Sequence, residues 1–108
     1  MTPSEPAAVP ELSERQNRYL RGLAHRLKPL IRVGNAGLTE AIVREMARAL
    51  HDHELIKVKA PGGDRGVREA LILGLAGKTA SVLVHRIGHV AVYYRPRTDM
   101  PRLLIPDP

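Results

Sequence analysis

Apolar residues at helical spacing mark the first predicted helix, near the start of the chain. Four of them share one helical face: Leu20, Leu23, Ala24 and Leu27. Ser13 and Gln16 stand three residues apart in front of this run, which is the signature of a capping box. Lys28 precedes a proline, and a residue before proline is unfavourable in a helix. The pattern therefore predicts a helix over residues 13–27.

The next stretch alternates short apolar runs with a second helical pattern. Residues 30–33 and 55–59 have the length and the composition of strands. Residues 39–50 begin with a threonine, a favourable N-cap, and carry one apolar face made of Ile42, Val43, Met46 and Leu50. Side chains alternate along a strand, so Lys57 and Lys59 point away from the apolar side of the second strand. This strand is expected to have a basic outer face.

The C-terminal half predicts a third helix and a hairpin. Residues 64–76 carry a helical apolar stripe made of Val67, Leu71 and Leu75. Gly77 follows directly, and we interpret it as the glycine that ends this helix. Two strands, 81–87 and 90–95, then flank Gly88-His89, a two-residue hairpin loop of the kind that begins with glycine.

This turn places Ile87 opposite Val90 and thereby assigns the hairpin side chains to two faces. One face holds Leu83, His85, Ile87, Val90, Val92 and Tyr94. The other face holds Val82, Val84, Arg86, Ala91, Tyr93 and Arg95. Because the first set is the more apolar, we expect it to face the core, which leaves Arg86 and Arg95 on the more open side.

The predicted element order is α-β-α-β-α-β-β, which is typical of an α/β chain of the two-layer α+β type, with helices packed on a mixed four-stranded sheet. With 108 residues, the chain is long enough for one domain. Seven of the nine prolines fall within residues 1–10 or 96–108. We therefore expect a folded domain over 12–96, a disordered Pro-rich tail over 1–11 and a second extended, poorly ordered Pro-rich tail over 97–108.

The charge distribution indicates a polyanionic partner. The chain carries a net charge of +6, and residues 12–95 hold fifteen of its seventeen Lys and Arg against seven of its eleven Asp and Glu, a net of +8. A basic domain of this kind suits nucleic acid or an anionic membrane surface, although basic side chains also serve solubility. The absence of cysteine, of a secretory signal and of a long apolar stretch favours a cytoplasmic protein that does not span a membrane.

Gly34-Asn35-Ala36-Gly37 is the strongest candidate for a ligand contact. Glycines let the main chain approach a ligand closely, and the helix expected to open at Thr39 directs N–H groups and its positive dipole end to the same place. The same spacing recurs at Gly63-Asp64-Arg65-Gly66, which we take as a secondary contact, and at residues 74–77, which we assign to the helix end. Only the first copy lies between a strand and a helix, as a phosphate clamp requires.

Other kinds of chemistry have little support. Three tyrosines are the only aromatic residues of the Phe, Trp and Tyr class, so binding is expected through the nucleic acid backbone and charge rather than base stacking. His51-Asp52-His53-Glu54 has poor spacing for a metal site, and histidine at the end of the second helix more simply interacts with the last carbonyls and the negative end of the helix dipole. No serine has the setting of a nucleophile. We therefore expect no catalysis, no metal, no cofactor and no small-molecule substrate.

Three blocks of the chain resemble one known family. They are residues 30–39, residues 53–59 and residues 87–96, in this order. Together they make residues 12–96 similar to the CRM domain (chloroplast RNA splicing and ribosome maturation), in its single-domain bacterial YhbY type. The resemblance implies an RNA-binding domain with the fold of the C-terminal domain of bacterial translation initiation factor three, and a role in assembly of the large ribosomal subunit. The family's loop usually has a basic residue after its first glycine, where this chain has Asn35-Ala36.

Pattern and resemblance together predict a non-enzymatic protein that binds ribosomal RNA, in particles preceding the large subunit, through the glycine loop and a surrounding basic surface. The predicted RNA contacts are Arg32, Gly34, Asn35, Ala36, Gly37, Thr39, Lys57, Lys59 and Arg95. The alternative is an adaptor whose basic face docks on an acidic protein. An enzyme acting on RNA is less favoured, and phosphate contacts alone would not exclude DNA.

Overall fold

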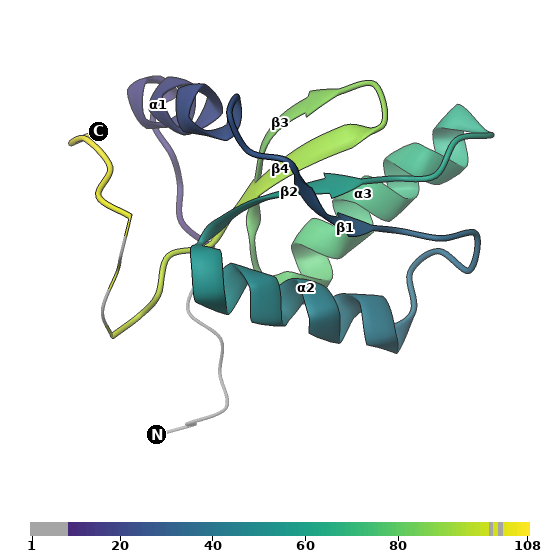
Figure 1. Cartoon of the computed structure of the whole chain (residues 1–108). Coiled ribbons are helices and arrows are strands. Elements are labelled where there is room, and N and C mark those ends of the chain that lie inside the picture. The colour runs from purple at the N-terminus through teal and green to yellow at the C-terminus, as the bar shows by residue number, and fades with distance from the viewer. Residues whose placement is uncertain (1–8, 100, 102) are drawn as a thin grey trace.

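The computed structural model describes residues 9–99, 101 and 103–108, and in these residues three helices and four strands follow one another in the predicted order (Figure 1). They are α1 (Glu14–Ala24), β1 (Pro29–Arg32), α2 (Glu40–His53), β2 (Leu55–Lys59), α3 (Arg65–Thr79), β3 (Val82–Ile87) and β4 (Val90–Tyr94). Most of the predicted N-terminal tail, residues 1–8, lies outside the described residues.

The strands form one mixed sheet in the order β1-β2-β4-β3. β1 runs parallel to β2, and β4 lies between β2 and β3 and is antiparallel to both. This confirms the α+β class and the mixed four-stranded sheet. Gly88 has a φ of +57°, a value that glycine reaches without steric cost, and the turn pairs Ile87 with Val90 as predicted.

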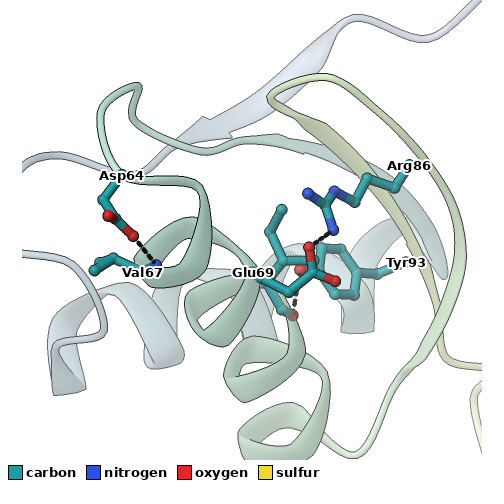
Figure 2. Close-up of polar contacts among 6 residues, drawn as sticks. Asp64, Val67, Glu69, Arg86 and Tyr93 are labelled. Carbon is teal, nitrogen blue, oxygen red and sulfur yellow. Dashed lines mark hydrogen bonds and ion pairs between the residues drawn. The ribbon is translucent and has the colours of Figure 1, made fainter.

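Each helix begins at a side-chain cap. The Ser13 hydroxyl accepts from the Gln16 N–H, and the Gln16 side chain accepts from the Ser13 N–H, so the predicted capping box is present. Thr39 caps α2, and Asp64 caps α3 by accepting from the Val67 N–H at 2.9 Å (Figure 2). These caps satisfy N–H groups that have no partner inside the helix.

The helices cover both faces of the sheet. α2 and α3 pack on one face and enclose the larger core, which consists mainly of Ile31, Met46, Leu50, Ile56, Val58, Leu71, Ile72, Leu75, Ala91 and Tyr93. α1 packs on the other face, where Leu20 and Ala24 cover Leu55, Val84, Val92 and Tyr94. Leu103 and Ile105 of the C-terminal segment also pack on this face, and a groove beside α1 remains open there.

The predicted faces of the hairpin are wrong in part. Ala91 and Tyr93 face the larger core, whereas Ile87 is 69% exposed. His85, Arg86 and Ile87 keep the register that the turn predicts, but the pairing of β3 with β4 shifts between Leu83 and His85, so the residues further from the turn are displaced by one position. Leu83 therefore packs with Tyr93, and Val84 packs on the α1 side.

The end of α3 also differs from the prediction. The helix continues through Gly77 to Thr79 and ends at Ala80, which has a left-handed φ of +52°. The extra turn is stabilised because Thr79 is buried and its hydroxyl donates to the Leu75 carbonyl at 2.7 Å. Val67, which we expected in the core, is 69% exposed, and Ile72 joins the buried stripe instead.

The C-terminal segment has specific contacts with the domain, although its prolines indicated a poorly ordered tail. Glu54 accepts hydrogen bonds from the backbone N–H groups of Arg97 and Leu103 at 2.9 and 2.7 Å. Gln16 of α1 donates to the Pro106 carbonyl at 3.0 Å. These contacts hold the segment against α1 and the start of β2.

Candidate nucleic-acid interface

The glycine loop connects β1 to α2, as the sequence predicts. The Gly37 N–H donates to the Gly34 carbonyl at 3.0 Å, which closes the turn, and the Thr39 N–H donates back to the Gly37 carbonyl at 3.0 Å. Gly37 has a φ of +71°, so this position favours glycine. A Cβ atom at either glycine would meet no heavy atom within 4 Å, so both face open space.

The first turn of α2 continues the loop. The Thr39 hydroxyl accepts from the Ile42 N–H at 3.2 Å and so uses one of the amides at this helix end. A hollow of about 310 Å³ opens beside it, lined among others by Thr39, Glu40, Arg44 and Lys78. The two cations outnumber the single carboxylate, and the positive end of the helix dipole adds to their field.

Three predicted basic residues, Arg32, Lys57 and Lys59, lie on the sheet beside this loop, and together they are called the basic row. Arg32 of β1 pairs with Lys59 of β2, and the Val33 N–H donates to the Lys59 carbonyl at 2.9 Å, directly before Gly34. Lys57 lies two positions before Lys59 and therefore on the same face. The intervening Val58 is buried against α2 and α3, so the basic side chains are on the opposite face, which also carries α1.

The structure does not bring Arg95 to this group. Arg95 follows β4 at the end where Tyr94 pairs with Leu55, whereas the glycine loop lies beside Lys59 at the other end of β2. Its guanidinium donates to the carbonyls of Thr79 and Ala47 at 2.9 and 3.1 Å, which links α3 to α2. Burial lowers the pKa of Arg95. Sequence periodicity could not show this role, because both partners are backbone atoms of distant helices.

The secondary glycine motif lies at the same end of the sheet as the first. The Ala60 N–H donates to the His89 carbonyl at 2.7 Å, which ties the connection before α3 to the β3–β4 turn. A hollow of about 470 Å³ is lined there by Arg65, Arg68, Arg86 and Gly88. Figure 2 shows Arg86 reaching from β3 to the Glu69 carboxylate on α3. Arg86 is therefore on the face covered by α2 and α3, and part of its positive charge is neutralised.

The remaining polar candidates have structural partners. Ser13 caps α1, and Ser81 shares a hydrogen bond of 2.8 Å with Thr79 in the interior. No group of three or more His, Asp or Glu side chains in the described part of the chain is placed to hold a metal ion. Within the same residues, no helix has the length and the apolar composition needed to cross a membrane.

A small basic α+β domain with a glycine turn at a helix N-terminus, beside a row of cationic side chains, is suited to a polyanionic ligand. The sequence model of the CRS1/YhbY (CRM) domain matches residues 12–95, so the chain belongs to this family. The family resemblance expected from the three sequence blocks is thereby confirmed.

Three relatives and one solved structure agree with this membership. The chain is 45% identical over 88 residues to an "RNA-binding protein" of Haemophilus influenzae, a match that spans 82% of this chain and 89% of the relative. It is 43% identical over 84 residues to a "Probable RNA-binding protein" of Pseudomonas aeruginosa, covering 78% and 81%. A similarly named Bacillus subtilis protein is 33% identical over 99 residues, covering 88% and 99%.

The fold is shared with a protein from Staphylococcus aureus whose solution structure was presented as that of a candidate RNA-binding protein. The TM-score is 0.75 at 32% sequence identity, and the match covers 89% of this chain and all of the other. The two proteins therefore share their fold over most of this chain.

Proposed function

We propose that this protein is a non-enzymatic, cytoplasmic RNA-binding protein that holds ribosomal RNA in particles preceding the large ribosomal subunit. The glycine loop with the first turn of α2 contacts phosphates, and Arg32, Lys57 and Lys59 supply the surrounding positive field. Asn35 and Ala36 form the exposed tip of the loop. The Asn35 amide is able to bond a phosphate oxygen or a ribose 2′-hydroxyl.

The main observation behind the proposal is that the glycine loop begins directly beside the basic row. The Val33 N–H to Lys59 carbonyl bond brings β2 to the start of the loop, and Gly34 follows Val33 in sequence. A strand of RNA lying along the row therefore meets the loop at its end. Membership of the CRM family and the names of the relatives support RNA, rather than another polyanion, as the ligand.

The test uses the protein in its own cells. RNA is crosslinked before lysis, the protein is recovered, and the attached fragments are sequenced for the wild type, Gly37→Asp and Gly37→Asn. Asparagine tolerates the left-handed backbone at this position, whereas aspartate adds a carboxylate of the same size beside phosphate. We expect large-subunit ribosomal segments from immature particles, lost with Gly37→Asp and largely kept with Gly37→Asn.

Two outcomes would contradict the proposal. Equal recovery of ribosomal RNA with Gly37→Asp and Gly37→Asn would mean that the phosphate contact lies outside the loop. Scattered or absent RNA, together with an acidic protein retained after nuclease treatment, would assign the basic face to a protein partner instead.

A further inference from the structure

A groove lies between α1 and the open part of the sheet. Its volume is about 580 Å³, and α1 contributes one wall while β2, β3 and β4 form the floor. Gly22 and Ala24 are small residues in the α1 wall, and no heavy atom lies within 4 Å of the position where a Cβ of residue 22 would stand. A side chain at position 22 would therefore enter open space at the wall of the groove.

The floor and the rim of the groove differ in chemistry. Ile87, Val90 and Val92 make the floor apolar, and the 69% exposure of Ile87 is high for a large aliphatic residue. The rim carries Arg18, Arg21 and Lys57, and none of the lining residues is acidic. An apolar floor inside a cationic rim matches a ligand with a flat uncharged part and an anionic backbone.

Two histidines supply flat faces in the same groove. His25 follows α1, and His85 lies on β3, where its pairing with Val92 of β4 places it on the α1 side. Histidine rings and arginine guanidinium groups both stack on nucleobases, as phenylalanine and tyrosine do. The chain therefore has stacking surfaces here although it contains no Phe or Trp.

The groove is continuous with the basic row at the glycine loop. Lys57 lines the groove, and Lys59 lies two residues further along the same face of β2, about 7 Å away. Arg32 pairs with Lys59 and leads to Gly34. A nucleic acid backbone is able to follow these cations from the groove to the loop.

We propose that the groove binds an unpaired nucleobase of a single RNA strand whose phosphates lie on Lys57, Lys59 and the glycine loop. The inference rests on the RNA binding proposed above and adds a preference for single-stranded over fully paired RNA. Base stacking on His25, His85 or an arginine, above an aliphatic floor, accepts any base and confers little sequence preference.

Gly22→Leu tests the groove without changing its charge. Leucine adds a bulky side chain at the groove wall, and it is a better helix former than glycine at an exposed position of α1, so the variant is expected to fold. Two probes are compared by fluorescence anisotropy with the full chain: a single-stranded RNA of about 12 nucleotides and the same strand made abasic at every position. The abasic strand keeps the phosphates and lacks the bases.

We expect Gly22→Leu to weaken binding of the base-bearing strand about ten-fold and to leave binding of the abasic strand unchanged. Gly77→Leu is the matched control, since Gly77 is exposed on α3, on the other side of the sheet, with no heavy atom within 4 Å of its Cβ position. It should alter neither affinity. His85→Ala should also weaken only the base-bearing strand, and His85→Phe should restore that binding.

Three outcomes would overturn the inference. If Gly22→Leu binds both strands as tightly as the wild type, the groove does not bind a nucleobase. Equal loss on both strands would mean that leucine disturbs the phosphate path instead. Loss of a copurifying protein, with RNA binding intact, would make the groove a protein-docking surface. If Gly37→Asp also leaves both strands bound as tightly as the wild type, the proposed phosphate clamp fails separately from the groove.

Discussion

The Oε1 atom of Glu54 accepts a hydrogen bond from the Leu103 N–H at 2.7 Å, although the two residues are 49 positions apart. Glu54 ends α2 with a left-handed φ of +64°, and its side chain is fully buried. The second carboxylate oxygen accepts from the Arg97 N–H at 2.9 Å. One buried carboxylate thus fixes the C-terminal segment to the end of a helix.

Glu54→Gln should lower the free energy of unfolding by about 1–2 kcal/mol. The amide oxygen still accepts one of the two backbone bonds, but the amide NH₂ then faces the other backbone donor. Urea unfolding followed by circular dichroism measures the change. Glu45→Gln on the exposed face of α2 is the control and should stay within about 0.5 kcal/mol of the wild type. An equal effect of the two substitutions would mean that the buried bonds contribute nothing.

Local signals account for most of the predicted fold. The capping box at Ser13, the cap at Thr39 and the turn at Gly88 are interactions between residues at most three apart, so the sequence displays them directly. The faces of β3 were predicted incorrectly because a bulge changes the side-chain alternation without any sequence signal, and because helices on both sides give β4 two buried faces.

Tyr93→Phe should lower the free energy of unfolding by about 1 kcal/mol at neutral pH, because the Tyr93 hydroxyl donates to the Ile72 carbonyl at 2.7 Å in the interior. Figure 2 shows this hydroxyl directed at α3. Urea unfolding near neutral pH measures the loss. Tyr19→Phe on the exposed surface of α1 is the control and should change the stability little.

The same hydroxyl makes the fold sensitive to alkali. Burial raises the pKa of Tyr93 well above its usual value, against a smaller lowering by Arg86, and burial with the Glu54 charge raises the pKa of Tyr94. A raised folded-state pKa means that the folded chain keeps protons which the unfolded chain releases near pH 10. This part of the stability is fully present below about pH 10 and decreases above it. The free energy of unfolding should therefore decrease less between pH 9 and pH 11 for Tyr93→Phe than for the wild type.

Ala80→Gly should raise the free energy of unfolding by about 0.5–1 kcal/mol. Ala80 ends α3 with a φ of +52°, and in this conformation its Cβ approaches the following carbonyl oxygen. Ala70→Gly, at an exposed position inside the same helix, should lower the stability by about 1 kcal/mol. If urea unfolding shows that Ala80→Gly raises the free energy of unfolding and Ala70→Gly lowers it, backbone strain at Ala80 is distinguished from a loss of helix propensity. Loss of stability in both variants would contradict strain at Ala80.

The position of the glycine loop could be predicted because its residues are neighbours in sequence. Arg32 ends β1, and Gly34 and Gly37 follow within five residues, so their proximity follows from the chain itself. The α1 groove combines residues from one helix and three strands, and no spacing in the sequence indicates that Gly22, Val90 and Val92 line the same groove. Arg95 was placed on the open face by strand alternation, yet its guanidinium bonds two helix carbonyls.

The salt dependence of RNA affinity should distinguish Lys59 of the basic row from Arg95, whose side chain links two helices. Each phosphate neutralised on a single strand changes the slope of log affinity against log salt by about −0.7, so Lys59→Gln should make that slope shallower by about 0.7. Arg95→Gln should leave the slope unchanged and lower the free energy of unfolding by about 1–3 kcal/mol, because the Thr79 and Ala47 carbonyls lose their charged donor. Anisotropy titrations from low to high salt and urea unfolding measure the two effects. A shallower slope for Arg95→Gln, with the free energy of unfolding unchanged, would mean that Arg95 contacts RNA and does not stabilise the fold.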